Sequence, residues 1–568
     1  MDSQCERDDP NFDSEAPINT KSLDHGKSLD HGKSLDHGKS LDHGKSLEFD
    51  DSMTDVETRS LPPHTTDRLI DRLATIHPAA WLAALGALIF TVVFGRLGVQ
   101  HHRNFGTWAF DMGIYDQSFW LVSRGKSWVT VRGLDFWGHH VNLIAVAFAP
   151  FYWLGAGPSF LYVVQAGALG AGAVPTYLLA RDRMRNPWLG LVFAVVYLMY
   201  APIQWISWAN FHPESLVITP LLFAWWFATQ RRWRPFFISI VIAMSAREDA
   251  ALAVFMMGLV LWLTLWRDAE AGRRDQRMAL AAAALGVVWY AVCTRLVIPA
   301  FNQGKQPFYI GYFYGNYGSN AVEIAQTIIT RPDRVLSDAT QPDRLRFYRD
   351  LLLPWGGLPL AGLLQLAMAL PQTLASVIGL SPYARSIRYQ YTAVMIAPIV
   401  IASIEGAAWM WRYRIVRRFL VPWLLVCAYV SNVAWSPSPI SANQGVWARP
   451  TERHEALRTA IDLVPDGVSV AATYSLGPHL SHREQIYDWP NPWVPAYWGN
   501  NDTYRLPDPS TIEYIVIDRN HVGPEQQQLL LDLVGPGGEF EVLYDAADVV
   551  VGRRSGGSAP ISAGDSNP

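Results

Sequence analysis

Charged residues and cysteines are both scarce in this chain of 568 residues. Only 17% of the residues are Asp, Glu, Lys or Arg, whereas an ordinary soluble domain has about 25%. The three cysteines, Cys5, Cys293 and Cys427, form neither a disulfide framework nor a zinc-ligand pattern. The net charge of -4 is small and carries no basic excess, so we expect no nucleic-acid partner.

Common catalytic and targeting motifs are missing as well. No Walker loop, GxSxG, HExxH or dinucleotide fingerprint occurs in a suitable context. A cleavable signal peptide is not visible, because residues 1–75 are hydrophilic. We therefore expect the first apolar segment to act as an uncleaved signal-anchor.

Long apolar segments, by contrast, are abundant. The chain is 50% hydrophobic and holds 24 Trp, 23 Tyr and 24 Phe, and aromatic residues favour membrane–water interfaces. The stretches 236–266 and 352–380 are long enough for a double or re-entrant pass, so we expect about ten to twelve transmembrane helices. The apolar segments lie near 79–99, 141–155, 159–180, 188–205, 215–230, 236–266, 279–299, 352–380, 391–410 and 417–435.

Composition divides the chain into four parts. Residues 1–75 contain four consecutive KSLDHG repeats with one apolar residue each, and we expect a disordered tail. Residues 76–436 form the transmembrane domain, 450–553 a small α/β domain, and 554–568 a second disordered tail. In the α/β domain we expect helices at 451–464 and 525–534, strands at 468–473 and 513–518, and a final hairpin at 540–554.

Clusters of Arg predict the orientation in the membrane. Basic residues gather at 181–185, 231–234, 266–277 and 412–418, and such loops stay in the cytoplasm. We therefore expect a multi-pass plasma-membrane protein with a cytoplasmic N-terminus, a first outer loop at 100–138 and an extracytoplasmic C-terminal domain. The chain from His140 to Arg181 must then cross an odd number of times. GAGP at 155–158 divides this stretch in two, which leaves its number of spans open.

Ionisable groups beside apolar segments are the candidates for a functional site. The stretch FDMGIYDQSFW (110–120) follows the first apolar segment and holds Asp111 and Asp116. On a helix the two acids would point about 140° apart, so both cannot easily reach one ligand. Asp111 lies closer to the first span and ranks first. The alternative is an interfacial helix with two solvated acids.

Histidines mark two further candidates. His139 and His140 in WGHHVN stand where the next apolar segment begins, and an imidazole beside a carboxylate could bind a divalent cation or a phosphate. In NFHPE, Pro213 disfavours helical geometry at His212, so His212 and Glu214 lie at a break in the chain. The alternatives are a polar interfacial boundary and a simple loop.

Three consecutive charges interrupt about 30 apolar residues in AREDAAL (246–252). A lone charge in the middle of a bilayer costs at least ~2.5–3.5 kcal/mol, so Arg247, Glu248 and Asp249 indicate a functional cavity or an ion pair between two helices. The aromatic run at 306–320 could stack on sugar rings or anchor the chain at the interface. The sequence does not separate these two roles.

Several motifs together resemble one family. FDMGIYDQ, GHHVNLIAVAFAPFYWL, NFHPE and REDAAL, in that order, and SLGPHLSHREQIYDWP near the C-terminus resemble the polytopic proteins grouped as domain of unknown function 2079. The likeness covers residues 90–553. The family's layout, with an acid in the first outer loop, is similar to the GT-C superfamily of membrane glycosyltransferases, which use polyprenyl-phosphate sugars. The resemblance thus implies a GT-C-like α-helical polytopic fold.

The resemblance also implies residue roles. Asp111 and Asp116 match the acids of the first-loop motif, and Arg247 stands where the family often has Lys. His140 matches the His of a His-Phe-Ser-Pro motif, but Val141, Asn142 and Leu143 follow it here in place of the Phe, Ser and Pro. His212 and Glu214 match the His-Pro-Glu motif.

A GT-C-like enzyme would transfer a sugar from a polyprenyl-phosphate donor to an envelope glycan or protein on the outer face. Asp111, with Asp116 second, would be the general base or would hold a divalent cation, Mg²⁺ or Mn²⁺. The rival functions are a transporter or flippase of a lipid-linked or small polar solute, and a non-catalytic envelope scaffold. The predicted substrate-binding residues are His139, His140, His212, Glu214, Arg247, Glu248 and Asp249.

Overall fold

The computed structural model describes residues 76–305, 307–497 and 504–556. The KSLDHG repeats and the rest of the predicted N-terminal tail lie outside the described residues, as does most of the tail predicted at 554–568.

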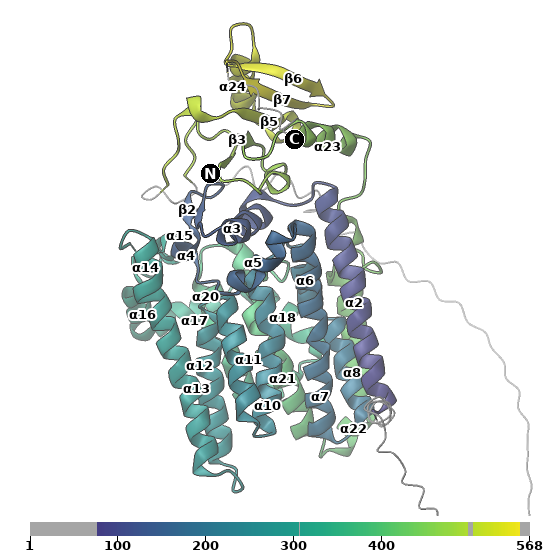
Figure 1. The fold of residues 1–568 in the computed structure, drawn as a ribbon. Helices are drawn as coiled ribbons and strands as arrows, with labels where there is room; N and C mark the ends of the chain where they lie inside the picture. The colour runs from purple at the N-terminus through teal and green to yellow at the C-terminus, as the bar shows by residue number, and fades with distance from the viewer. Residues whose placement is uncertain (1–75, 306, 498–503, 557–568) are drawn as a thin grey trace, which may run out of the picture. The chain divides into compact units, whose positions relative to one another are not determined.

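Apolar helices make up most of the described chain (Figure 1). Five are long and apolar enough to cross a membrane, and a sixth is if the pair α8 (Pro187–Leu198) and α9 (Ala201–Trp208), bent by 43°, is one span. The predicted α-helical polytopic architecture is confirmed, but by length and composition five or six described helices qualify as spans, whereas about ten to twelve were expected. The five single candidates are α2 (Pro78–Arg103), α6 with α7 (Pro158–Met184), α13 to α14 (Arg273–Phe301), the helix ending with α21 (Gln390–Met410) and α22 (Arg414–Trp435).

The stretch between residues 139 and 181 holds one candidate span. Its first helix, α5 (Ile144–Trp153), has 10 residues and is therefore about 15 Å long, roughly half of the hydrocarbon core. The predicted span at 141–155 is corrected accordingly. Of the helices in this stretch, only α6 (Pro158–Ala171) and α7 (Ala173–Met184) together are long and apolar enough to span a membrane, and one span agrees with the odd number of crossings expected from the basic clusters.

Two predicted long segments are broken. The segment at 236–266 forms α11 (Trp233–Ala246) and α12 (Ala250–Trp266), with the three charges at the break. The segment at 352–380 is interrupted at Gly356 and Gly357, whose φ angles of 62° and 77° are left-handed and end a helix. Around this break lie α18 (Pro342–Leu352), η4 (Leu353–Trp355), η5 (Leu358–Ala361), α19 (Leu363–Leu366), η6 (Ala367–Ala369) and α20 (Leu370–Ile378).

The four basic clusters lie at one end of the helices, called the basic end below. The ring of His77, next to the start of α2, contacts that of Trp188 at 5.4 Å, which brings the start of α2 to the same end. Side-chain contacts join the clusters: Trp226 Nε1 donates to Asp182 at 2.9 Å, Arg231 pairs with Asp275 at 2.5 Å, and Arg183 pairs with Glu405 at 2.8 Å.

Short elements fill the connections away from the basic end. They include the first loop, where the chain turns back through a two-stranded antiparallel ribbon. These elements are η1 (Ala109–Gly113), α3 (Ile114–Val122), β1 (Trp128–Val129), β2 (Leu134–Asp135), α4 (Phe136–His139), η2 (Pro213–Val217), α15 (Phe308–Tyr314), α16 (Ala321–Thr330) and α17 (Pro332–Ala339).

The C-terminal region forms a five-stranded mixed sheet in the order β4-β3-β5-β7-β6. Strands β3 (Val470–Ala472), β4 (Ile486–Asp488) and β5 (Tyr514–Asp518) are parallel, while β6 (Phe540–Ala546) and β7 (Val549–Arg554) form the predicted antiparallel hairpin. Helices α23 (Arg453–Asp462) and α24 (Pro524–Val534) accompany the sheet. The predicted α/β region is confirmed, and only β4 was not foreseen.

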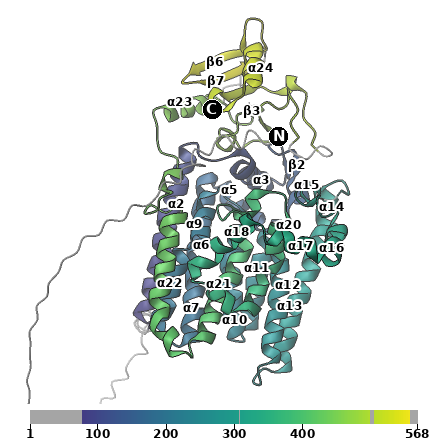
Figure 2. The ribbon, with the colours of Figure 1, turned by 180° about the vertical axis from the view of Figure 1, so that it is seen from behind.

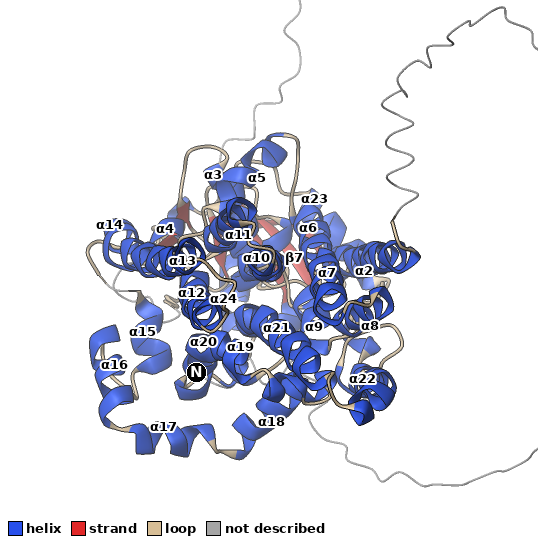
Figure 3. Ribbon diagram, turned by 90° about the horizontal axis from the view of Figure 1, so that it is seen from below, coloured by secondary structure: helices blue, strands red, loops and turns tan. Residues whose placement is uncertain are grey.

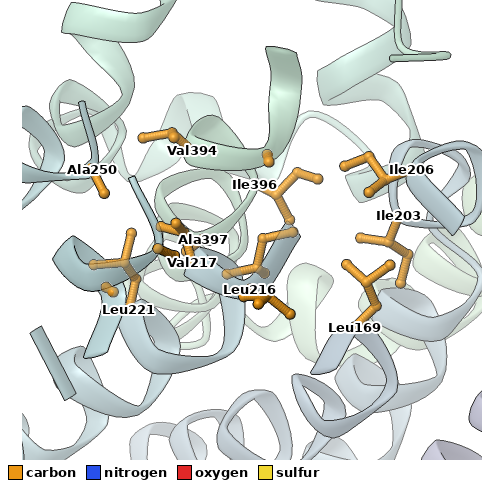
Figure 4. Close-up of a cluster of buried hydrophobic side chains, with 14 of the residues drawn as sticks. Leu169, Ile203, Ile206, Leu216, Val217, Leu221, Ala250, Val394, Ile396 and Ala397 are labelled. Atoms are coloured by element: carbon orange, nitrogen blue, oxygen red, sulfur yellow. The ribbon is translucent and has the colours of Figure 1, made fainter. Parts of the chain in front are cut away.

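The apolar core lies directly behind the polar residues of interest. Leu216 and Val217 follow Glu214 in η2, and Ala250 follows Asp249, and all three pack in one cluster with α21 (Ala393–Met410) (Figure 4). Viewed from below, α21 is surrounded by other helices (Figure 3), and most of its residues are buried. The charged groups are thus attached directly to the buried apolar core.

Candidate functional site

Asp111 and His212 come together although they are about 100 residues apart in sequence. Asp111 lies in η1, a single π-helical turn after the first long helix, and His212 lies in extended backbone before η2. Asp111 Oδ1 is 3.1 Å from His212 Nε2, and the side chains are 27% and 5% exposed. Because an ionised carboxylate only accepts hydrogen bonds, His212 Nε2 carries the hydrogen. Asp111 is therefore oriented by a buried ring and still open on one side.

Gln165 holds the segment that carries His212. Its side chain is fully buried in α6. Gln165 Nε2 donates to the carbonyls of Ile206 and Asn210, both at 2.8 Å, and Oε1 accepts from the His212 backbone N–H at 3.1 Å. One amide thus satisfies three backbone groups where the helix stops, which fixes the position of the His212 ring.

The break between α11 and α12 brings Arg247 to Glu214. The Arg247 guanidinium pairs with the Glu214 carboxylate, and its Nε lies 3.2 Å from Asp249 Oδ2. The side chains are 16%, 4% and 24% exposed in the order Arg247, Glu214 and Asp249. The structure thus joins the NFHPE and AREDAAL motifs through an ion pair.

Glu248 connects the same break to the second histidine motif. Its Oε1 is 2.7 Å from His140 Nδ1, and its Oε2 accepts from the Val141 backbone N–H at 3.0 Å. The Tyr309 ring stacks on His140 with centroids 5.2 Å apart, and His139 lies at 4.2 Å from His140. Tyr309 belongs to the aromatic run at 306–320, so part of that run lies at this cluster.

These contacts bring the four sequence motifs into one neighbourhood, called the polar cluster below. Tyr115 lies within electrostatic range of Asp111, Arg247 and Glu248. Tyr391 is within range of Asp111 and Arg247. The polar cluster contains Asp111, His139, His140, His212, Glu214, Arg247, Glu248 and Asp249, which are all the predicted site residues except Asp116.

Asp116 turns away from this cluster. It is fully buried and accepts hydrogen bonds from Tyr152 Oη at 2.8 Å and Ser481 Oγ at 2.5 Å, while His482 Nε2 lies 3.0 Å from its Oδ2. Burial lowers the pKa of His482, but the charge and hydrogen bond of Asp116 outweigh this, so the pKa is raised. Asp116 therefore fastens the C-terminal region to α3 and α5, and it does not accompany Asp111.

A comparison with protein families independently supports the resemblance found in the sequence motifs. Residues 101–551 match the family model described as "Predicted membrane protein (DUF2079)". The chain belongs to this family. A search among curated proteins finds no match.

The fold also matches a solved structure. That structure is ArnT from Cupriavidus metallidurans bound to undecaprenyl phosphate, with a TM-score of 0.51, 13% sequence identity, and coverage of 83% of this chain and 97% of that chain. At this identity the likeness concerns the fold alone. The predicted GT-C-like fold is confirmed over nearly the whole length of ArnT.

The polar cluster does not form a metal site with three protein ligands. Catalytic zinc is usually held by three such ligands, whereas Mg²⁺ is usually bound by one or two carboxylates together with substrate phosphates. Within residues 76–305, 307–497 and 504–556, no three His, Cys, Asp or Glu side chains group as a metal site requires, and the Arg247 guanidinium lies among the acids. A divalent cation at Asp111 stays a prediction, and no step proposed below depends on it.

Sequence reasoning missed several residues of the neighbourhood. Gln165 is a lone amide inside an apolar segment, and a polar side chain in that position indicates a residue with a specific hydrogen-bonding role. Tyr115 and Tyr391 are ordinary aromatic residues among many. Only the folded chain shows that they lie within electrostatic range of Asp111 and Arg247.

Proposed function

We propose that this membrane protein is a glycosyltransferase that moves a sugar from a polyprenyl-phosphate donor to an envelope glycan or protein. The observation that carries the proposal is the partly exposed Asp111 carboxylate, which is held by the buried His212, while Tyr391 lies within electrostatic range of both Asp111 and Arg247. The fold likeness to a structure that contains undecaprenyl phosphate supports a lipid-linked donor.

In the proposed reaction, Asp111 accepts the proton of the acceptor hydroxyl. The acceptor oxygen forms a bond to the anomeric carbon of the sugar. The bond from that carbon to the phosphate oxygen breaks, and its electron pair leaves with the lipid phosphate. The hydrogen bond from His212 holds the Asp111 carboxylate in position, and Arg247 offsets the negative charge that grows on the phosphate.

The pairing of Arg247 has a consequence for this role. Glu214 and Asp249 hold the guanidinium in place, but they also neutralise part of its charge. A leaving phosphate would therefore compete with these acids for the guanidinium. We infer that Glu214, the more buried acid, positions Arg247, and that Asp249, which is more exposed, gives way to substrate.

The position of the polar cluster relative to the basic end of the helices supports a site on the outer face. The basic clusters gather at the basic end, and such clusters stay in the cytoplasm. The chain passes from the basic end along α2 to Asp111 in η1. We infer that the polar cluster and the C-terminal region face the outside of the plasma membrane, where the C-terminal region would present the acceptor.

Comparison of cells with and without the gene tests the proposal. Envelope glycans and lipid-linked sugars are extracted and quantified by mass spectrometry. A transferase predicts one lost glycan together with an accumulating lipid-linked sugar on the outer leaflet. Accumulation of the lipid-linked sugar on the inner leaflet alone would support a flippase instead. Unchanged glycans and lipids would favour the non-catalytic envelope scaffold.

A further inference from the structure

A groove with a volume of about 280 Å³ lies beside α22, towards the basic end. Its walls come from the chain break before η5, the end of α21 and one face of α22. Every lining residue is apolar or glycine, including Leu358, Met410, Val416 and Trp423. Because α22 lies at the periphery of the helices (Figures 2 and 3), this groove faces the lipid.

The break at Gly356 and Gly357 creates the hollow. A Cβ at Gly357 would meet no atom within 4 Å, so the space beside it is open. Trp423 Nε1 donates to the Gly356 carbonyl at 3.0 Å, which satisfies a backbone group that would be costly in hydrocarbon. The groove therefore offers an apolar surface that suits a hydrocarbon chain.

Four arginines lie in the turn and the first residues of α22, next in sequence to the groove-lining residues Met410, Ile415, Val416 and Phe419. From Ile415 to Trp423 the α22 face is about 12 Å long, so it runs from the headgroup region into the hydrocarbon. The Arg412 guanidinium lies over the Trp409 and Tyr413 rings, and Arg417 Nε donates to the Trp411 carbonyl. Among the described residues no carboxylate pairs with the four exposed arginines of this turn, Arg412, Arg414, Arg417 and Arg418.

We propose that this groove binds an anionic phospholipid from the leaflet at the basic end. One acyl chain lies along Val416 and Trp423, and the phosphate meets Arg412 and Arg417. The uncompensated positive charge selects an anionic headgroup over a zwitterionic one, as in basic pockets between membrane helices. This lipid site is separate from the polar cluster and does not depend on the proposed function.

Native mass spectrometry of the full chain in detergent tests the site. The protein is mixed with equal amounts of phosphatidylglycerol and phosphatidylcholine, and the retained lipids are counted. We expect phosphatidylglycerol to dominate, and Arg412→Gln with Arg417→Gln to lower its retention at least threefold. Val416→Trp, which fills the groove without changing charge, should lower it similarly. Arg234→Gln, an exposed arginine of another basic cluster, should not.

Each of several results would overturn the inference. They are equal retention of both lipids by the wild type, unchanged retention in the groove variants, and an equal loss in Arg234→Gln. Displacement of phosphatidylglycerol by an equal amount of undecaprenyl phosphate would also overturn it, because the groove would then serve a polyprenyl chain. Thermal melting of each variant shows whether it is folded. If one of the two groove variants melts early, the conclusion is drawn from the other groove variant.

Discussion

Replacing Asp111 with Asn should separate catalysis from folding. The substitution keeps the shape of the side chain and removes its charge. Asp111 is partly exposed, and among the described residues its side chain has one hydrogen bond, accepted from His212 Nε2 at 3.1 Å, so stability should fall by only about 1 kcal/mol. Loss of a general base slows a reaction by roughly 10²–10⁴-fold, or about 2.7–5.5 kcal/mol in activation free energy. The catalytic effect is therefore expected to exceed the structural one severalfold.

The assay uses the glycan that disappears when the gene is deleted. Cells that lack the chromosomal gene receive the wild type, Asp111→Asn or Glu484→Gln, an exposed carboxylate of the C-terminal region. Glycan formation is followed over time and divided by the amount of folded protein in the membrane. We expect a loss of at least about 100-fold for Asp111→Asn and no loss for Glu484→Gln. Wild-type transfer by well-folded Asp111→Asn would refute the reasoning.

Three further predictions concern positioning and pH, each measured on the full chain in detergent. Gln165→Leu leaves up to three buried backbone groups unpaired, at about 1–3 kcal/mol each. The melting temperature of this variant should therefore drop. An unchanged melting temperature would contradict the role of Gln165 in holding the segment that carries His212. The pKa of His482 is raised beside Asp116, so the contribution of His482 to stability is complete below about pH 6.5 and is lost as pH rises through its folded-state pKa. His482→Gln should remove this part of the pH dependence of stability. A pH–stability profile identical to that of the wild type would argue against the His482–Asp116 contact. Burial raises the pKa of Asp488 to about 8, so the stability of the protein should decline between about pH 4 and 8. Asp488→Asn should flatten that decline and raise the melting temperature at pH 8. A lower melting temperature of the variant would show that the carboxylate is needed for stability.

Local chemistry was enough to find the residues of the polar cluster. Arg247, Glu248 and Asp249 stand out because charges interrupt an apolar segment, and His212 stands out because Pro213 breaks the helix beside it. The angle argument for Asp111 and Asp116 also agrees with their separation, since one meets His212 and the other meets Ser481.

Long-range partners were beyond sequence reasoning. Asp116 and Ser481 are 365 positions apart, so nothing near Asp116 indicates that it fastens the C-terminal region. The stacking of Tyr309 on His140 likewise depends on the folded chain. An apolar run such as 306–320 has the same composition whether it anchors the protein in lipid or covers a polar cluster.

Breaks inside apolar segments were the main source of error in the fold. Hydropathy shows the amount of apolar chain but not where a helix stops, so 141–155 was taken for a span that α5 is too short to make. The pair Gly356 and Gly357 was a local signal for the break before η5, because left-handed backbone favours glycine. Strand β4 was missed because its three residues lie in a stretch rich in turns.

The central claim is that Asp111 and the polar cluster face the outside, opposite the basic clusters. Thiol labelling of intact cells tests this most directly, using Asp111→Cys and Arg185→Cys in a variant whose three native cysteines are replaced. The account predicts that a membrane-impermeant reagent labels Asp111→Cys from outside and labels Arg185→Cys only after the membrane is opened. Labelling of Asp111→Cys only in opened cells would contradict it.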